Sequence, residues 1–461
     1  MVSTIPIFEV EFDKYGNIFD PGQVQTALDS LSDRGVTDLL VFSHGWNNDM
    51  QDARDLYGLF FQKVEEMLVE HHREQLETRT FAALAVLWPS KKFTDEELIP
   101  SGDAASAEPD ELDPILQEQL ENLKVDPMRL GEHTPADANE RVALERAQAQ
   151  VAQLEEDEDA QREFVEAIRS MLPRAAAHAD DGSDEFFTRD AVELLQDLAR
   201  PVVAPPPTGQ GGGALSLDDD VGTAAGEAAG IRDLWGGIKA GARRLLNFTT
   251  YYKMKERAGL VGKTGVADVL RQLCQHLPQI KIHLIGHSFG GRLVTAVADI
   301  LGPQVKINSL TLLQAAYSHN GLAARFDGEH DGFFRKVVSG KKVDGPILIT
   351  HTKNDKAVGI AYPLASRISR DKAASLFGDA NDPYGGMGRN GAQFTPEVGE
   401  ERVLRAAGSQ YVFQSGSIYN LNADQFIQGH SDICKEEVAH AVLSAVATRG
   451  GMELHAQSVP L

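Results

Sequence analysis

A serine flanked by glycines is the strongest chemical signal in the chain. Residues 286–291 have the sequence GHSFGG, which fits the pattern G-x-S-x-G with Ser288 at its centre. A mostly apolar run at 280–285 precedes this motif, and a helix-like segment at 292–301 follows it. A sharp strand-to-helix turn lifts its middle side chain above the sheet and places it at a helix N-terminus, where developing negative charge is stabilised. Ser288 is therefore our candidate nucleophile.

The residues around Ser288 support the same interpretation. Side chains at Gly286 and Gly290 would collide where such a turn packs against itself, so glycine is expected at both positions. His287 belongs to the same turn and is expected to support it.

A serine hydroxyl is a weak nucleophile unless a base removes its proton, and a carboxylate must then orient that base. Asp355 lies in ILITHTKNDKAVG, just after an apolar segment at 345–351. Ligand sites of open α/β sheets lie at such carboxyl ends of strands. Asp344 and Asp371 lie away from this strand end, so Asp355 is our candidate acid.

His430 is the candidate base. It lies in IQGHSDICK, a loop that precedes the last predicted helix at 435–448. His440 is its competitor, but it falls inside that helix, where a packing histidine is the more ordinary interpretation. The chain order is then Ser288, Asp355, His430, which is the order of one of the known triad arrangements.

Acyl transfer also requires two backbone N–H groups that stabilise the oxyanion. Phe289, the residue after the nucleophile, is expected to supply one of them. Trp46 is expected to supply the second, because FSHGWNND follows an early apolar run at 39–42. In this loop Gly45 lets the backbone approach the substrate. His44 is interpreted as a residue that shapes the loop, since the triad needs no second base.

Buried strands that alternate with helices must position these residues. We expect strands at 39–42, 81–89, 280–286, 307–315 and 345–351, after a strand-like opening, IPIFEVEF, and a short helix near 24–31. Helices are expected at 51–77, 231–257, 265–277, 290–301 and 435–448. This alternation predicts an α/β protein with a mostly parallel central sheet that is flanked by helices on both faces.

A large acidic segment interrupts the alternation. Residues 91–230 contain 33 Asp and Glu but 11 Lys and Arg, a net charge of −22 out of −24 for the chain. Helices are expected at 111–124 and 139–171, and the Pro- and Gly-rich stretch 201–229 is expected to be a mobile loop. We therefore predict a core in two parts, 1–90 and 231–461, with 91–230 as an inserted, partly disordered lid.

Composition restricts the partners. A net charge of −24 disfavours nucleic acid, because phosphate is repelled. No apolar stretch reaches about 18 residues, so no stable membrane insertion is expected. No signal peptide is recognised, which predicts a cytoplasmic protein, although export without a classical signal stays open. Cys274 and Cys434 form neither a disulfide framework nor a metal-ligand pattern. No metal and no organic cofactor is expected, and the oligomeric state is left open.

These motifs together resemble the α/β-hydrolase superfamily. Within it, the chain is similar to a group of poorly characterised bacterial hydrolases that share four features: an HG[FW]NN-type loop, a strand ending in Trp-Pro-Ser, a Tyr-containing helix and a GHS elbow. Here these are residues 44–48, 88–90, Tyr251 with Tyr252, and 286–291. The resemblance covers about 1–90 and 248–448 and implies an α/β-hydrolase fold. Because 91–230 departs from it, substrate specificity is left open.

Three functions are compatible with the sequence. The first is a serine hydrolase of the esterase or lipase type that cleaves small-molecule carboxylic esters. The second is a lipid acyl hydrolase, which the long insertion and the amphipathic stretch LWGGIKAGARRLLNF (234–248) suggest. The third is an interaction protein without catalytic activity, because fold does not determine function. The Gly-containing stretch 382–394 has no strand-to-helix setting and is interpreted as a loop beside the site.

Overall fold

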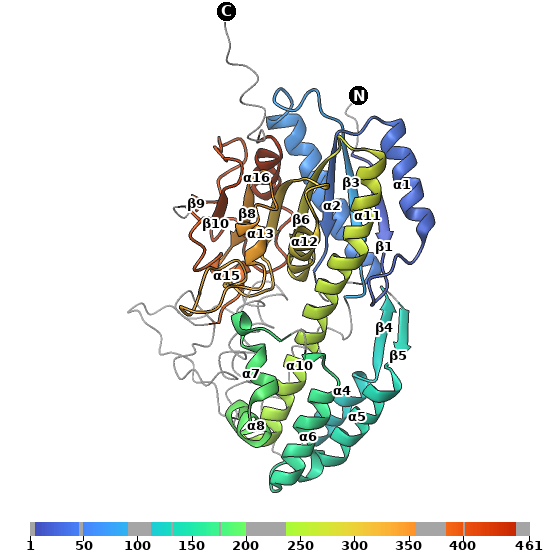
Figure 1. The fold of residues 1–461 in the computed structure, drawn as a ribbon, viewed down its shortest axis with the longest axis vertical. Coiled ribbons are helices and arrows are strands. Elements are labelled where there is room, and N and C mark those ends of the chain that lie inside the picture. Colours follow the sequence, from blue (N-terminus) through green and yellow to red (C-terminus); the bar gives the residue numbers. More distant parts are fainter. Residues whose placement is uncertain are drawn as a thin grey trace, which may run out of the picture.

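The computed structural model describes residues 5–45, 49–90, 112–130, 132–174, 177–199, 237–355, 384–399 and 402–448. Its centre is an eight-stranded sheet (Figure 1). The strands are β1 (Ile7–Glu11), β2 (Asp38–Ser43), β3 (Phe81–Leu87), β6 (Lys281–His287), β7 (Ile307–Leu313), β8 (Ile347–His351), β9 (Arg402–Val403) and β10 (Ile418–Asn422). Their order is β1-β3-β2-β6-β7-β8-β10-β9, and all seven neighbouring pairs are parallel.

The central strands are buried on both faces. Every residue of β2 and β3 is buried. Leu39 and Val41 contribute to one hydrophobic cluster, and Leu40 and Phe42 contribute to another, because successive side chains of a strand point to opposite faces. A parallel sheet covered on both faces explains the continuous apolar runs in the sequence. The predicted fold class is confirmed.

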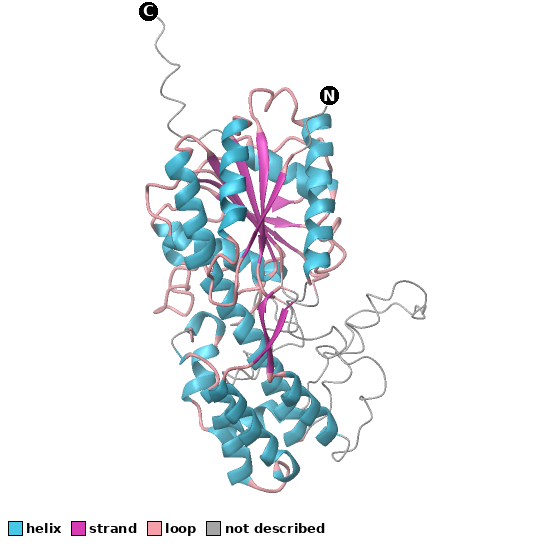
Figure 2. Ribbon diagram, turned by 90° about the vertical axis from the view of Figure 1, so that its right-hand side faces the viewer, coloured by secondary structure: helices cyan, strands magenta, loops and turns pink. Residues whose placement is uncertain are grey.

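Helices cover both faces of the sheet (Figure 2). One face packs against α1 (Pro21–Asp33), α11 (Ala267–His276) and α12 (Phe289–Ile300). The other packs against α2 (Met50–His71) and α16 (Glu436–Val446). Two of these helices begin at a capping residue: Asp20 caps α1, and Asp49 with Asp52 forms a capping box at α2. Two short helices, α13 (Arg335–Ser339) and α15 (Met387–Asn390), lie in loops of the second half.

The insertion folds as a helical layer below the sheet in Figure 1. It contains α4 (Leu112–Asn122), the antiparallel hairpin β4 (Val125–Arg129) and β5 (Glu132–Pro135), α5 (Ala138–Gln150), α6 (Glu158–Ser170), α7 (Ser183–Thr188) and α8 (Ala191–Ala199). Its own hydrophobic cluster also includes Leu245, Phe248 and Tyr252 from α10 (Ile238–Val261). The C-terminal half of α10 instead contributes Met254, Ala258 and Val261 to the sheet cluster. One helix therefore belongs to both hydrophobic cores.

Several elements differ from the sequence-based expectations. The single helix expected over 139–171 is interrupted, because Asp157 adopts an extended conformation and caps α6 with its side chain. The helices α7 and α8, the β4–β5 hairpin, and the strands β9 and β10 were not predicted. The expected mobile loop at 201–229 lies outside the described residues, and the division of the chain at 90/91 and 230/231 stays a prediction.

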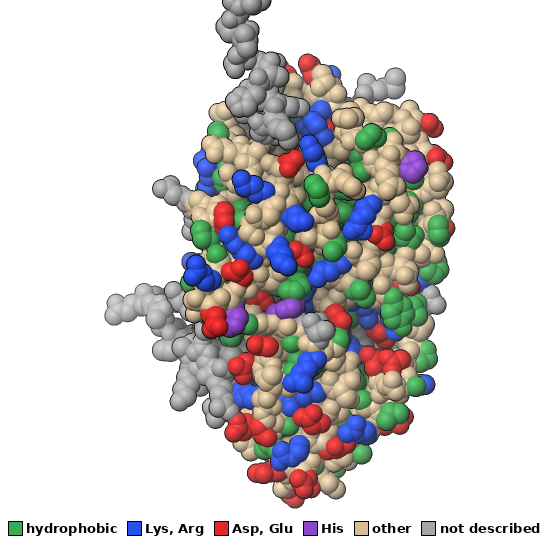
Figure 3. Space-filling view, in the orientation of Figure 1, with side chains coloured by type: hydrophobic (Ala, Val, Ile, Leu, Met, Phe, Trp, Pro, Cys, Tyr) green, Lys and Arg blue, Asp and Glu red, His purple; other side chains and the backbone are tan. Residues whose placement is uncertain are grey.

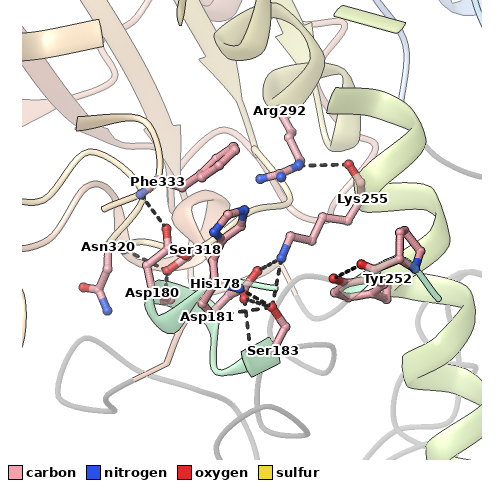
Figure 4. A network of polar contacts seen from close by, with 11 residues as sticks. His178, Asp180, Asp181, Ser183, Tyr252, Lys255, Arg292, Ser318, Asn320 and Phe333 are labelled. Atoms are coloured by element: carbon pink, nitrogen blue, oxygen red, sulfur yellow. Dashed lines mark hydrogen bonds and ion pairs between the residues drawn. The ribbon is translucent and has the colours of Figure 1, made fainter. Parts of the chain in front are cut away.

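A buried ionic joint connects the insertion to the sheet (Figure 4). Lys255 of α10 is 1% exposed, and its Nζ forms an ion pair with Asp181 of the insertion. Asp180, next to it, accepts a hydrogen bond from the backbone N–H of Phe333 over 3.1 Å. Arg292 of α12 donates through Nε to the carbonyl of Lys255 at 2.9 Å. The joint thus links the insertion to α10, to α12 and to the segment that follows β7.

The pKa values of the two buried acids, Asp180 and Asp181, are shifted in opposite directions. Burial raises the pKa of Asp180 to about 6, and the neighbouring Asp181 carboxylate acts in the same direction. Burial also acts to raise the pKa of Asp181, but the Lys255 ammonium outweighs it, and the net pKa is lowered. Asp181 is therefore the charged partner of Lys255 in the buried pair.

Charged side chains are interspersed over the face of the molecule drawn in Figure 3, and acidic ones occur at the tip of the helical insertion. Among the described residues, no helix is both long and apolar enough to cross a membrane.

Two buried histidines form a hydrogen-bonded pair between α2 and α16. His440 Nε2 lies 2.7 Å from the carbonyl of Ser409 and must donate to it. Its Nδ1 therefore accepts from His72 Nε2 at 2.9 Å. Burial lowers the pKa of His72 to about 4, and the proximity of His440 adds to this. His440 is thus a packing residue, as expected, and both rings are neutral at pH 7.

This pair predicts acid sensitivity. His72 has a lower pKa in the fold than the ordinary 6.5, so the unfolded chain binds its proton first as the pH falls. Its contribution to stability is complete above pH 6.5 and is lost between pH 6.5 and 4. Between pH 7.5 and 5 the loss is about 2 kcal/mol from the linkage relation. In His72→Gln, urea unfolding at the two pH values should show a correspondingly smaller decrease. An identical decrease in both proteins would contradict this prediction.

Candidate active site

A strained turn presents Ser288 at the carboxyl end of β6. Strand β6 ends at His287, α12 begins at Phe289, and Ser288 between them has φ 56° and ψ −125°. A positive φ is costly for a residue other than glycine and persists where the surroundings enforce it. The Ser288 N–H donates to the carbonyl of Leu313 at 3.0 Å, and its carbonyl accepts from Ala316 N–H at 3.0 Å. The adjacent strand β7 therefore holds the turn in place.

Close packing explains the glycines of the turn. A Cβ atom on Gly286 would lie 2.3 Å from the carbonyl oxygen of Gly290. A Cβ on Gly290 would lie 2.1 Å from the carbonyl oxygen of Ser43, and one on Gly45 would lie 2.5 Å from the Cβ of Ser288. These distances are far below van der Waals contact, so β2, its following loop and the turn can approach only without side chains.

The structure brings together the three residues of the predicted triad. His430 Nε2 lies 2.8 Å from Ser288 Oγ, and His430 Nδ1 lies 2.8 Å from Asp355 Oδ2. Asp355 is fully buried in the loop after β8, whereas the side chain of His430 is 20% exposed. Nδ1 therefore donates to the carboxylate, and the Nε2 lone pair faces the serine hydroxyl. This geometry allows proton transfer from the hydroxyl to the ring.

The competing residues lie elsewhere. Asp344 precedes β8, so it lies at the opposite end of the strand from Asp355. His440 faces His72 and the Ser409 carbonyl. Asp371 lies outside the described residues.

The loop after β2 is held by aromatic residues. The N–H of His44 donates to Tyr57 Oη at 3.0 Å, and Trp88 Nε1 donates to the carbonyl of His44 at 3.1 Å. The rings of His44 and Trp88 stack, with centroids 5.6 Å apart. His44 Nδ1 lies 2.8 Å from the carbonyl of Gly45, and burial lowers the pKa of His44 to about 4. His44 is therefore neutral and contributes to the contacts that hold the loop, and its assignment as a loop-shaping residue stays a prediction.

Of the two expected oxyanion donors, the structure describes Phe289 but not Trp46. Phe289 is the first residue of α12, so its N–H lies at the positive end of the helix dipole. Its ring packs 5.2 Å from the ring of Tyr251. Trp46 lies outside the described residues, and its assignment stays a prediction.

Sequence analysis missed a set of hydrogen bonds between the loop that carries Asp355 and the loop that carries His430. Asp424 Oδ1 accepts from the hydroxyl of Thr352 at 2.9 Å and from Lys353 N–H at 2.8 Å. Asn354 Nδ2 donates to the carbonyl of Ile427 at 2.8 Å. These contacts connect the segment before Asp355 to the segment before His430. A detectable signal existed, since Asp424 follows a strand at the same edge of the sheet, but β10 was not predicted.

Comparison with known proteins agrees with this architecture. A parallel sheet with helices on both faces and polar side chains at its carboxyl edge is the architecture of an open α/β protein. A family model described as alpha/beta hydrolase fold matches residues 252–360, which include Ser288 and Asp355. The matched segment supports membership of the α/β-hydrolase superfamily, and the fold suggests a hydrolase. No curated protein and no solved structure matched the chain.

The packing of the turn predicts that Gly290→Ala is strongly destabilising. The added methyl group would meet the carbonyl oxygens of Ser43 and His44 at 2.1 and 2.5 Å, and backbone atoms of a central strand cannot easily move. Urea unfolding should show a loss of about 3 kcal/mol or more. Gly58→Ala is the matched control: its Cβ would meet nothing within 4 Å, and alanine should stabilise α2 by about 0.5–1 kcal/mol. An unchanged stability of Gly290→Ala would refute the packing argument.

Proposed function

We propose that the chain is a serine hydrolase that cleaves carboxylic esters through an acyl-enzyme intermediate. The observation that carries the proposal is the continuous hydrogen-bonded series Ser288–His430–Asp355, with 2.8 Å at each contact. Such a series activates a hydroxyl that is otherwise a weak nucleophile. The strained conformation of Ser288 and its position at the start of α12 also support the proposal.

In the proposed reaction, Ser288 Oγ attacks the ester carbonyl carbon while its proton moves to His430 Nε2. Asp355 stabilises the imidazolium that forms. The N–H groups of Phe289 and Trp46 would stabilise the oxyanion. The tetrahedral intermediate collapses, the carbon–oxygen bond to the alcohol breaks, and His430 gives the proton to the leaving alkoxide. Water then attacks the acyl carbon while its proton moves to His430 Nε2. The second tetrahedral intermediate collapses, the bond from the acyl carbon to Ser288 Oγ breaks, and His430 returns the proton to Oγ, which releases the acid and restores Ser288.

The structure weakens the argument for lipid substrates. The amphipathic stretch that suggested membrane contact lies in α10, where its described residues are largely buried. Leu245 and Leu246 pack in the core of the insertion. Lys239 forms an ion pair with Asp113 at 2.6 Å, and Arg244 donates to the carbonyl of Leu198. We therefore favour small-molecule esters, with lipid acyl hydrolysis as the alternative.

A fluorophosphonate probe tests the proposal directly. The wild type should be labelled on the peptide that contains Ser288, and Ser288→Ala should not be labelled. A wild type that neither labels nor hydrolyses any ester would support the third interpretation, an interaction protein on a hydrolase fold. A panel of short and long acyl esters, with and without phospholipid vesicles, distinguishes the two enzyme classes. A rise in rate at the vesicle surface would favour the lipid alternative.

A further inference from the structure

His287 is a buried histidine whose ring lies against the ring of the candidate base. It is 4% exposed, and its centroid lies 5.0 Å from that of His430. Its Nε2 lies 2.9 Å from the backbone carbonyl oxygen of His430. His287 ends β6 and directly precedes Ser288, so this contact joins the loop of the base to the strand that carries the nucleophile.

The contact fixes the state of the His287 ring. A carbonyl oxygen can only accept a hydrogen bond, so Nε2 carries the proton. Burial lowers the pKa of His287 to about 3, and the proximity of His430 acts in the same direction. The ring is therefore neutral, and Nδ1 has a lone pair. Within the described part of the chain, this buried Nδ1 has no hydrogen-bond partner. Among the described residues, the hydrogen bond to the His430 carbonyl is thus the polar contact of the ring.

The hydrogen bonds of Asp424 and Asn354 attach the segment before His430 to the loop of Asp355, but they end at Ile427 and do not reach residue 430. Nearer to His430, the Asp432 N–H donates to the carbonyl of Gly429 at 3.3 Å, and the Gln428 N–H donates to Asp432 Oδ2 at 3.0 Å. Both contacts are internal to the loop. By contrast, the hydrogen bond from His287 comes from β6, a central strand of the sheet, and reaches the backbone of residue 430 itself.

We propose that His287 is a positioning residue that holds the backbone of His430, so that the imidazole reaches both Ser288 and Asp355. The inference rests on the proposed function and extends it to a residue outside the triad. The geometric requirement is strict, because both nitrogens of His430, each 2.8 Å from its partner, must stay within hydrogen-bond reach at the same time. A displacement of about 1 Å in such an arrangement can cost about 100-fold in rate.

Two substitutions separate the hydrogen bond from the bulk of the ring. His287→Gln keeps an N–H donor at a similar reach, whereas His287→Leu fills space without a donor. For a p-nitrophenyl ester, His287→Leu should lower kcat by about 10- to 100-fold with little change in KM. The acidic limb of the pH profile of kcat/KM should move to lower pH, because a poorly held imidazolium gains less from Asp355. His287→Gln should restore most of kcat and the wild-type profile.

A matched control and a readout independent of activity complete the test. His440→Leu removes another buried hydrogen bond from histidine to a backbone carbonyl and should leave kcat unchanged. Amide hydrogen exchange over residues 424–434 should accelerate in His287→Leu but not in His287→Gln. Equal kcat, pH profile and exchange in His287→Leu and wild type would overturn the inference, and so would a Gln variant as impaired as the Leu variant. If the wild type lacks esterase activity, the proposed function fails, and hydrogen exchange still decides whether His287 holds the loop.

Discussion

Replacing Ser288 with alanine is expected to lower kcat for ester hydrolysis by about 10⁴- to 10⁶-fold, the range seen when a triad nucleophile is removed. The substitution deletes the Oγ atom, which lies 2.8 Å from His430 Nε2, and leaves no other nucleophile in this position. KM for the same ester should change little, because the hydroxyl contributes mainly to the transition state. Steady-state kinetics on purified wild type and variant measure both parameters.

The fold of the Ser288→Ala variant should remain intact. Ser288 is 4% exposed, and the hydrogen bonds of its backbone to Leu313 and Ala316 do not involve its side chain. Circular dichroism and the thermal midpoint serve as controls. If a folded variant kept more than about 1% of wild-type kcat, the loss would be far smaller than removal of a triad nucleophile causes, and the nucleophile would have to be another residue.

Replacing Lys255 with methionine is expected to destabilise the protein by about 3–5 kcal/mol, as is typical when one partner of a buried ion pair is removed. The ammonium is 1% exposed and pairs with Asp181, which is 6% exposed. Without Lys255, the Asp181 carboxylate would be left in a buried environment without its cation. Urea unfolding measures the loss, and limited proteolysis shows whether the insertion opens first.

Two further variants test whether the loss of stability in Lys255→Met comes from the buried charge that is left on Asp181. In the double variant Lys255→Met with Asp181→Asn, the charge left behind is also removed, so part of the stability should return. Lys63→Met removes a partly exposed partner of Glu66 and Glu436 and should have little effect, since ion pairs at the surface contribute little. If Lys255→Met behaved like Lys63→Met, the joint would not hold the insertion on the sheet.

The candidate triad residues could be predicted from the sequence more readily than the contacts that hold them in position. Ser288, Asp355 and His430 each follow a rule about where functional residues lie: a glycine-flanked turn, a strand end and a loop before the last helix. The two hydrogen bonds among them agree with those rules, while their catalytic roles stay proposed. The contact of His287 with the His430 carbonyl could not be predicted, because it joins residues 143 positions apart and no local pattern encodes it.

The same limit explains the errors in the fold. Strand β10 has the sequence IYNLN, and its two asparagines are unfavourable for a strand. It forms because it pairs with β8 along its whole length, and this long-range pairing leaves no local signal. The break before α6 did have a signal, the capping residue Asp157, but the acidic run around it concealed this single cap. Packing across the sequence therefore decided the elements that local patterns missed.

Helix α10 determines how the two parts of the molecule can move. Its 24 residues make a rod about 36 Å long, embedded at one end in the insertion and at the other against the sheet. A swinging motion requires a flexible segment at the boundary, and a continuous helix has none there. The nearest irregularity is the π-helical turn at Gly262–Val266, which lies on the side of the sheet, beyond the boundary. Access to Ser288 should therefore depend on local rearrangement of loops, while the helical layer keeps a fixed orientation.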